Sequence, residues 1–297
     1  MKRVRSRNAA RPAKASLEKE RRKEAPVKNK SSSNTFPIVG FGASAGGIEA
    51  FTMLLKHLDP DLGMAYVLIM HLSPNHKSAL PEILQSKTKM PVHSVADEME
   101  VTPNTIYVIP PNTFVSLVNG HFRLVPRSAD NFAVDYFFTA LASHYKNKAI
   151  GIILSGTATD GTLGLKAIKA EGGITFAQDE TAKFTGMPYN AYDAGYVDLL
   201  LPPAEMAREL SRLSKIKYTA LAPEKIEESH SKEIIDHTDD LKKILSIVKS
   251  KSGVDFFLHY KHASIYRRVV RRMTLNKLEK PDEYYEMLRT SPKEVDA

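Results

Sequence analysis

Cysteine is absent from this chain of 297 residues. Without cysteine, the protein can form neither disulfide bridges nor thiolate metal sites. Long apolar runs are absent too, because no stretch approaches the roughly 18–20 continuous apolar residues of a membrane-spanning helix. Residues 1–30 have neither the apolar segment nor the small-residue cleavage site of a secretory signal. These absences predict a cytoplasmic protein that is not inserted in a membrane.

Positive charge is concentrated at one end of the chain. The formal net charge is +8, but residues 1–30 contain 12 Lys and Arg against three Glu, so the rest of the chain is close to neutral. Residues 1–35 are polar and charged, which is typical of a disordered, solvated tail. Such a tail is also able to touch nucleic acid or anionic lipid. Because the remainder is nearly neutral, nucleic acid is not the expected partner.

Between residues 36 and 213 the chain alternates apolar runs with amphipathic segments. The runs lack polar alternation, as expected for strands of a parallel sheet that is covered on both faces. The predicted strands are Ile38–Gly42, Ala65–Met70, Ile106–Ile109, Ala149–Leu154, Ile174–Ala177 and Val197–Leu200. The predicted helices are Ile48–His57, Ala79–Ser86, Val134–Tyr145, Leu163–Ala170 and Ala204–Leu213. We expect an α/β domain with a doubly wound, mostly parallel sheet.

Two other features complete the predicted organisation. Short apolar runs flank Asn119-Gly120, and this pair predicts a β-hairpin insertion. Residues 214–235 are polar and are interpreted as a linker, whereas residues 236–297 carry apolar residues at helical spacing. The last segment is therefore expected to be a small all-helical domain.

The loop after the first predicted strand fits two motifs. Gly40-x-Gly42-x-x-Ala45 matches a dinucleotide-binding fingerprint, and Gly42-x-Ser44-x-Gly46 matches the loop that presents a nucleophilic serine. A dinucleotide site requires an acidic residue at the end of the second strand, to hold the ribose. That position carries His71 instead, which favours a serine nucleophile.

Three strand ends supply the groups of a hydrolytic triad. Ser44, His71 and Asp160 each follow a predicted strand, and parallel strands bring their carboxyl ends to one edge of a sheet. Serine needs an adjacent base, and the base needs a third group to orient it. The backbone amides of Ala45 and Thr157 are candidates for binding an oxyanion. Taken singly, each triad residue also fits a structural role, for example Ser44 or Asp160 as a helix cap.

Four motifs in this order resemble the catalytic domain of the chemotaxis protein-glutamate methylesterases of the CheB type. They are residues 41–50 (FGASAGGIEA), 70–74 (MHLSP), 154–161 (LSGTATDG) and 184–188 (FTGMP), and the likeness spans residues 36–213. The resemblance implies hydrolysis of glutamate γ-methyl esters on the cytoplasmic helical bundle of chemoreceptors, with release of methanol. Related members also deamidate glutamines. No cofactor is implied.

The resemblance assigns Ser44 as nucleophile, His71 as base and Asp160 as the orienting acid. It also places Met187 and Pro188 in a loop that lines the substrate cleft, although a plain turn explains them equally well. The chain departs from the usual family pattern at Ala45, Thr157 and Ala158, where Thr, Met and Gly are common. No phosphoacceptor receiver domain precedes residue 36, so regulation by aspartyl phosphorylation in cis is not expected.

A second resemblance covers the C-terminal residues. Residues 241–256 and 260–273 are similar to the small helical N-terminal domain of CheR-type receptor methyltransferases. The chain ends before any S-adenosylmethionine-binding sheet, so we expect no methyl transfer and interpret the chain as a truncated or split fusion. In the resembled domain a basic helix contacts the acidic receptor, which makes candidates of Arg267, Arg268, Arg271 and Arg272. A solvated basic face is the alternative.

Two other classes of function stay open. A non-catalytic adaptor would use the same fold to bind a receptor, a separate methyltransferase or a kinase component, with its activity lost through the departures in the loops. A nucleotide-binding module would use the glycine fingerprint. A metal site is not expected, because the histidines lack a metal-like spacing with carboxylates. They are His57, His76, His93 and His121.

Overall fold

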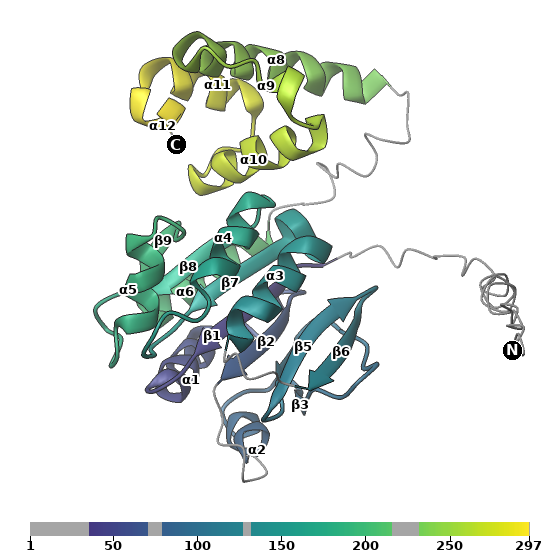
Figure 1. Cartoon of the computed structure of the whole chain (residues 1–297), viewed down its shortest axis with the longest axis vertical. Helices are drawn as coiled ribbons and strands as arrows, with labels where there is room; N and C mark the ends of the chain where they lie inside the picture. The colour runs from purple at the N-terminus through teal and green to yellow at the C-terminus, as the bar shows by residue number, and fades with distance from the viewer. Residues whose placement is uncertain (1–35, 71–78, 127–131, 216–231, 297) are drawn as a thin grey trace, which may run out of the picture. The chain divides into compact units, whose positions relative to one another are not determined.

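The computed structural model describes residues 36–70, 79–126, 132–215 and 232–296 (Figure 1). The predicted N-terminal tail and most of the predicted linker therefore lie outside the described residues. All the described elements belong to one unit, Asn34–Ala297.

A sheet of seven strands, all of them parallel, forms the centre of the first part of the chain. Its strand order is β3-β4-β2-β1-β7-β8-β9. The inner strands are buried at every position, which explains their continuous apolar sequence. The bounds are β1 Ile38–Ala43, β2 Ala65–Met70, β3 Val92–Ser94, β4 Thr105–Val108, β7 Ala149–Ile153, β8 Ile174–Gln178 and β9 Leu199–Leu201.

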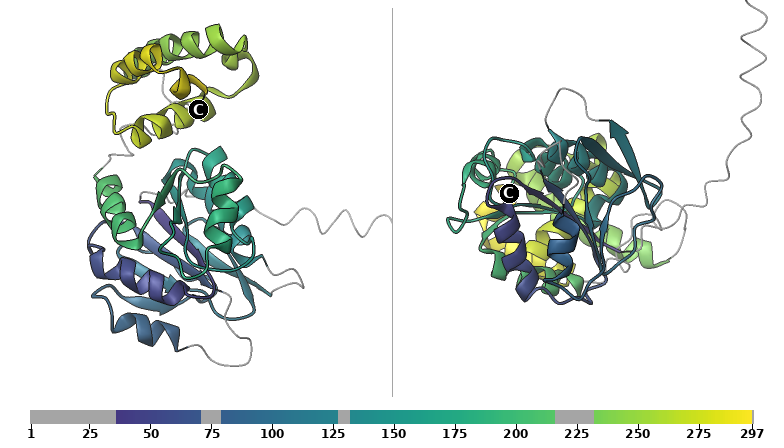
Figure 2. Two further views of the ribbon diagram at one scale, coloured as in Figure 1. Left: turned by 90° about the vertical axis from the view of Figure 1, so that its left-hand side faces the viewer. Right: turned by 90° about the horizontal axis from the view of Figure 1, so that it is seen from below.

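Helices cover both faces of this sheet (Figure 2). One apolar core contains residues of α1, α2 and α6, and a second core on the opposite face contains residues of α3, α4 and α5. The antiparallel hairpin of β5 (Thr113–Val118) and β6 (His121–Pro126) packs against α3. The helix bounds are α1 Gly47–His57, α2 Leu80–Gln85, α3 Ala133–Tyr145, α4 Thr162–Ala170, α5 Gly186–Asp193 and α6 Pro203–Ser214, and a 3-10 turn follows α3 at Lys146–Lys148.

Glycines in β1 let helix α3 approach the sheet closely. A Cβ atom at Gly40 would lie 2.7 Å from the ring of Phe138, and one at Gly42 would lie 2.8 Å from Ile153 and collide with Val134. These glycines therefore serve helix–sheet packing, and both lie inside the strand rather than in the loop. Their position gives no support to the dinucleotide fingerprint.

The C-terminal residues are helical, as predicted. Helices α8 to α12 bury two small apolar clusters, one around Ile244, Met273 and Tyr284 and the other around Leu241 and Ile265. The bounds are α8 Lys232–Ser252, α9 Phe256–His259, α10 His262–Leu275, α11 Pro281–Thr290 and α12 Pro292–Asp296. Within the described parts of the chain, no helix is both long and apolar enough to cross a bilayer.

The predicted fold class is confirmed: a doubly wound parallel sheet with a hairpin insertion precedes a helical segment. Within the α/β part of the chain, one strand and one α-helix were not predicted. Strand β3 has only three residues, and its partly exposed sequence Val92-His93-Ser94 carries no apolar run. Helix α5 begins Gly186-Met187-Pro188, a sequence that is typical of a loop. Proline is tolerated in a first helical turn because its missing N–H would have had no helical partner there.

Candidate active site

The strand order reverses between β1 and β7. From β1 the chain proceeds to β2 on one side, whereas β7 adds to the other side of β1. In open α/β sheets, ligands bind at the carboxyl ends of the strands beside such a reversal. The loops that leave β1 and β7 carry Ser44 and residues 154–161, so the predicted site residues fall at this point.

Ser44 lies in a tight turn between β1 and α1. Its N–H donates to the carbonyl oxygen of Ser155 (3.0 Å), and its own carbonyl accepts from Gly47 N–H (2.9 Å). The turn needs a left-handed residue, which Gly46 supplies with φ of 75°. Gly46 is the N-cap residue of α1, so the capping role considered for Ser44 does not apply at that helix start. Ser44 is half-buried and follows the strand end directly.

The hydroxyl of Ser155, which lies in the motif of residues 154–161 but was assigned no role from the sequence, joins two loops of the site. This buried Oγ donates to the carbonyl oxygen of Ala45 (2.8 Å) and accepts from the Phe184 N–H (3.0 Å). The Ser155 N–H in turn donates to Oε1 of Gln178 (3.0 Å), which is also buried. No spacing rule in the sequence distinguishes these two polar residues from ordinary strand ends.

A third loop, at the start of α5, is hydrogen-bonded to the loop that follows β7. Gly156 N–H donates to Phe184 O (3.0 Å), and Met187 N–H donates to Gly156 O (2.9 Å). A Cβ atom at Gly156 would collide with Sδ of Met187 and would lie 3.0 Å from Cβ of Ser44. The fully buried Met187 therefore lies close to Ser44, and Pro188 beside it is buried as well. Their role in a substrate cleft stays a prediction.

Asp160 is anchored to the first turn of α3. Its carboxylate, which is 2% exposed, accepts from Val134 N–H at Oδ2 (3.0 Å) and from Asp135 N–H at Oδ1 (2.9 Å). The helix α4 that follows Asp160 has Gly161 as its N-cap residue, so Asp160 does not cap its own helix. The carboxylate thus satisfies two of the N–H groups at the start of α3 that have no partner within the helix.

Asp135 forms the reverse contact. Its Oδ1 accepts from Gly164 N–H (2.6 Å) in the first turn of α4. Burial raises the pKa of Asp135 above its usual range, and the negative charge of Asp160 adds to that rise, while the backbone N–H groups oppose it. Sequence reasoning missed this second carboxylate.

The predicted base, His71, lies outside the described residues. The last described residue before it is Met70, which pairs with Ala43, the residue before Ser44. On the other side of β1, Gly42 pairs with Ile153. The three strands thus end within one or two residues of one another at the same edge.

The two amides proposed for an oxyanion belong to residues exposed at this edge. Ala45 and Thr157 are both exposed, and neither backbone N–H has a hydrogen-bond partner among the described residues. Ala45 lies just before helix α1, and exposed amides at a helix start are suited to binding an anion, whereas Thr157 lies in the loop between β7 and α4. Their use in catalysis stays a prediction. No group of three metal-ligating side chains gathers anywhere in the described parts of the chain.

Ala158 occupies the left-handed region, with φ of 69°, at a position where the resembled family commonly has glycine. This region destabilises an L-residue by roughly 1–2 kcal/mol. We expect Ala158→Gly to raise the free energy of unfolding by up to about 1 kcal/mol, since the greater entropy of glycine in the unfolded chain offsets part of the gain. Urea denaturation measures this change. The control Ala167→Gly, inside α4, should lower the same quantity by about 1 kcal/mol; equal stability of Ala158→Gly and the parent would contradict strain at this residue.

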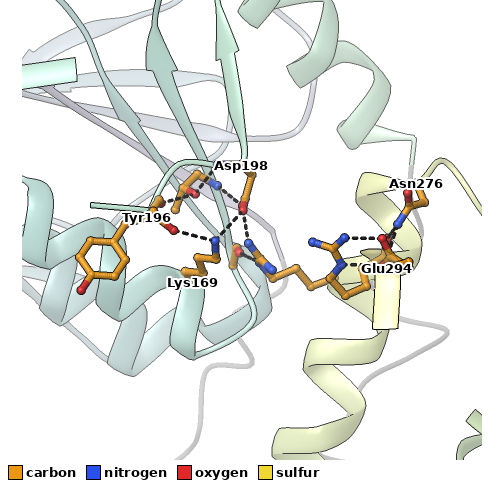
Figure 3. A network of polar contacts seen from close by, with 10 residues as sticks. Lys169, Tyr196, Asp198, Asn276 and Glu294 are labelled. Atoms are coloured by element: carbon orange, nitrogen blue, oxygen red, sulfur yellow. Dashed lines mark hydrogen bonds and ion pairs between the residues drawn. The ribbon is translucent and has the colours of Figure 1, made fainter. Parts of the chain in front are cut away.

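Arg271, one of the four arginines of α10 proposed to contact a receptor, is buried at 6% exposure. Its Nε donates to the carbonyl oxygen of Gly173 (2.8 Å), and its guanidinium pairs with Asp198. Lys169 approaches the same carboxylate at 3.6 Å (Figure 3). The guanidinium of Arg271 is therefore occupied by contacts within the chain.

The other three arginines differ in their surroundings. Arg272 donates through Nε to Glu294 Oε1 (2.8 Å), and Arg267 lies 3.4 Å from Glu171. Arg268 is exposed, with its guanidinium carbon 5.6 Å from the ring centre of Tyr260. Receptor contact by these side chains stays a prediction, and Arg268 is the most accessible of the four.

Comparisons with known proteins match both parts of the chain. A family model described as CheB methylesterase covers residues 39–210, and one described as CheR methyltransferase, all-alpha domain, covers residues 239–297. The crystal structure of the CheB methylesterase catalytic domain of Thermotoga maritima superposes with a TM-score of 0.56 at 30% identity, covering 60% of this chain and 98% of that one.

Curated relatives show the same likeness. A protein-glutamate methylesterase/protein-glutamine glutaminase of Burkholderia lata is 34% identical over 191 residues, and one of Rhizobium meliloti is 31% identical over 186 residues. Each match covers 60% of this chain, and 54% and 52% of those proteins. An uncharacterised 104.1 kDa protein of Rhodobacter capsulatus is 32% identical over an alignment of 228 residues, and the match covers 70% of this chain and 24% of that protein.

The matched regions thus span about half of the two methylesterases and about a quarter of the Rhodobacter protein. The predicted resemblance is confirmed for both regions, since each lies under a family model. The chain belongs to the CheB methylesterase family, and its C-terminal helices match the all-alpha domain of CheR methyltransferases.

Proposed function

We propose that this protein hydrolyses the γ-methyl esters of glutamate side chains on chemoreceptors, releasing methanol, and deamidates receptor glutamines by the same chemistry. The observation that carries the proposal is that the Ser44 turn and the loop with the anchored Asp160 leave neighbouring strands, β1 and β7, at the reversal of strand order. The printed names of the relatives, protein-glutamate methylesterase/protein-glutamine glutaminase, agree with this chemistry. Its site of action would be the cytoplasmic helical bundle of a receptor.

In the proposed mechanism, the Ser44 hydroxyl attacks the ester carbonyl carbon while His71 accepts its proton. The amides of Ala45 and Thr157 donate to the resulting oxyanion. His71 then protonates the departing methoxide, and methanol leaves behind an acyl-enzyme. Water, deprotonated by the same imidazole, attacks the acyl-enzyme and releases the glutamate carboxylate and the free serine. With glutamine as substrate, ammonia leaves in place of methanol.

Asp160 is suited to orient the imidazole for this cycle. Its buried carboxylate accepts two backbone N–H groups, which hold it in position. Such a group selects the tautomer of the base and stabilises the imidazolium that forms. The register that brings Met70 beside Ala43 supports the nearness of the base, because His71 and Ser44 each follow one member of this pair.

Methanol release from a methylated receptor fragment tests the proposal. Ser44→Ala should lower the rate of release by about 10⁴-fold or more, because the variant lacks the attacking oxygen. Ser143→Ala is the matched control, since its hydroxyl donates to Thr139 O on helix α3, and it should retain the parental rate. Receptor binding without methanol release by the parent would instead favour the adaptor, and tight binding of NAD would favour the nucleotide-binding module.

A further inference from the structure

Two carboxylates cap each other's helices at the candidate site. Asp160, directly before α4, accepts from the first N–H groups of α3. Asp135, in the first turn of α3, accepts from Gly164 N–H in the first turn of α4. The N–H groups of Gly161 and Leu163 also favour the charged form of the Asp135 carboxylate and so oppose the rise of its pKa. The two contacts and the short stretches of chain between them form a closed ring.

The proposed mechanism gives Asp135 no task, yet its position is unfavourable for a carboxylate. The group is partly buried and lies near a second carboxylate, and both circumstances disfavour its charged form. Groups kept in such unfavourable surroundings are concentrated at functional sites. The geometry rather than the charge shows what Asp135 does, because its acceptor atom joins the two helix starts that hold Asp160.

We propose that Asp135 is a positioning residue that holds the Asp160 carboxylate in its working orientation, an inference that rests on the proposed function. Both oxygens of Asp160 are bound by the first turn of α3, so any shift of that turn moves the carboxylate. The covalent chain places Asp160 directly before α4. Asp135 ties the two turns together and thereby fixes Asp160 with respect to both.

The rest of α3 is held independently of Asp135. Phe137 and Phe138 are fully buried, and the ring of Phe138 lies directly over Gly40 of β1. Loss of the Asp135 carboxylate should therefore loosen only the first turn of α3 and leave the fold in place. We therefore expect kcat to fall, because a displacement of about 1 Å in a catalytic group is able to lower a rate by about 10²-fold.

The first experiment measures kcat and KM of methanol release for Asp135→Leu and Asp135→Asn. We expect Asp135→Leu to lower kcat by about 10²-fold with KM within about twofold of the parent. Asp135→Asn keeps one acceptor oxygen for Gly164 N–H and should recover at least about tenfold of that loss. Asp97→Leu is the control, because this carboxylate accepts the Leu124 N–H on the hairpin and lies outside the ring. Circular dichroism and urea unfolding verify that each variant is folded.

A second experiment asks whether Asp135 acts through Asp160. In an Asp160→Asn background, Asp135→Leu should lower kcat by less than about threefold, because the group it positions has already lost its function. The same loss in both backgrounds, a loss in Asp97→Leu as large as that in Asp135→Leu, or a rise in KM alone would overturn the positioning role. Parental kcat in Asp135→Leu, together with methanol release that depends on Ser44, would overturn this inference and leave the proposed function standing. Absence of methanol release from the parent would overturn both.

Discussion

Removing the Ser44 hydroxyl and the Asp160 carboxylate together is expected to lower methanol release little more than removing the hydroxyl alone. Ser44→Ala should lower kcat/KM by about 10⁴-fold or more, because residues of a catalytic triad act as one unit. Asp160→Asn should lower it by about 10⁴-fold, because the amide favours the wrong tautomer of the base. The double variant should stay within about tenfold of Ser44→Ala.

Asn is used at position 160 because this substitution should leave the variant folded. Asp160 accepts the N–H groups of Val134 and Asp135, and Asn retains an oxygen for one of them. Initial rates of methanol release, measured below the unfolding transition of each variant, give the required values. Losses that multiply in the double variant would show that Ser44 and Asp160 do not belong to a common catalytic unit.

The second large effect is expected on stability, for Phe138→Ala. Its ring is fully buried in α3 and would lie within about 3.5 Å of a Cβ atom at Gly40, Gly151 or Gly164, so three glycines leave room for it. Truncation of a buried phenylalanine to alanine destabilises a protein by about 3–5 kcal/mol. Because whole domains are stable by only about 5–15 kcal/mol, this change should lower the unfolding midpoint in guanidinium markedly.

Phe132→Ala provides the control for this prediction. Phe132 precedes α3 and is 51% exposed, so its removal should change the free energy of unfolding by less than about 0.5 kcal/mol. Similar losses of unfolding free energy in the two variants would contradict the view that Gly40, Gly151 and Gly164 leave the space into which the ring of Phe138 packs. A loss of less than about 1 kcal/mol in Phe138→Ala would contradict it as well.

Hydrophobic pattern was sufficient to predict the sheet and most of its helices. A strand covered on both faces has to be apolar at every position, and β1, β2 and β7 show this in their sequences. The hairpin was predictable from the pair Asn119-Gly120, because Asn-Gly favours a turn that requires positive φ angles at both central residues. Both residues have positive φ angles in the structure. The failures at β3 and α5 have equally local causes: one strand is short and partly exposed, and one helix begins with glycine and carries proline in its first turn.

The candidate site was predictable only in part. Because parallel strands end at one edge, the positions of Ser44, His71 and Asp160 after three strands were enough to predict that they converge. The pattern of residues did not reveal that Asp160 binds the start of α3, that Asp135 binds the start of α4, or that Ser155 joins two loops. Each of these contacts links residues distant in sequence, and none leaves a periodic signal.

Local chemistry along the chain therefore sufficed for the fold class, the alternation of strands and helices, and the family motifs, since these depend on neighbouring residues and on burial of apolar faces. The helix that Asp160 caps, the packing role of Gly40 and Gly42, and the burial of Arg271 against Asp198 emerged only from the folded chain. The reason is physical: a carboxylate, a glycine or an arginine is compatible with many surroundings, and its partner is selected by whichever distant segment the packing brings within reach.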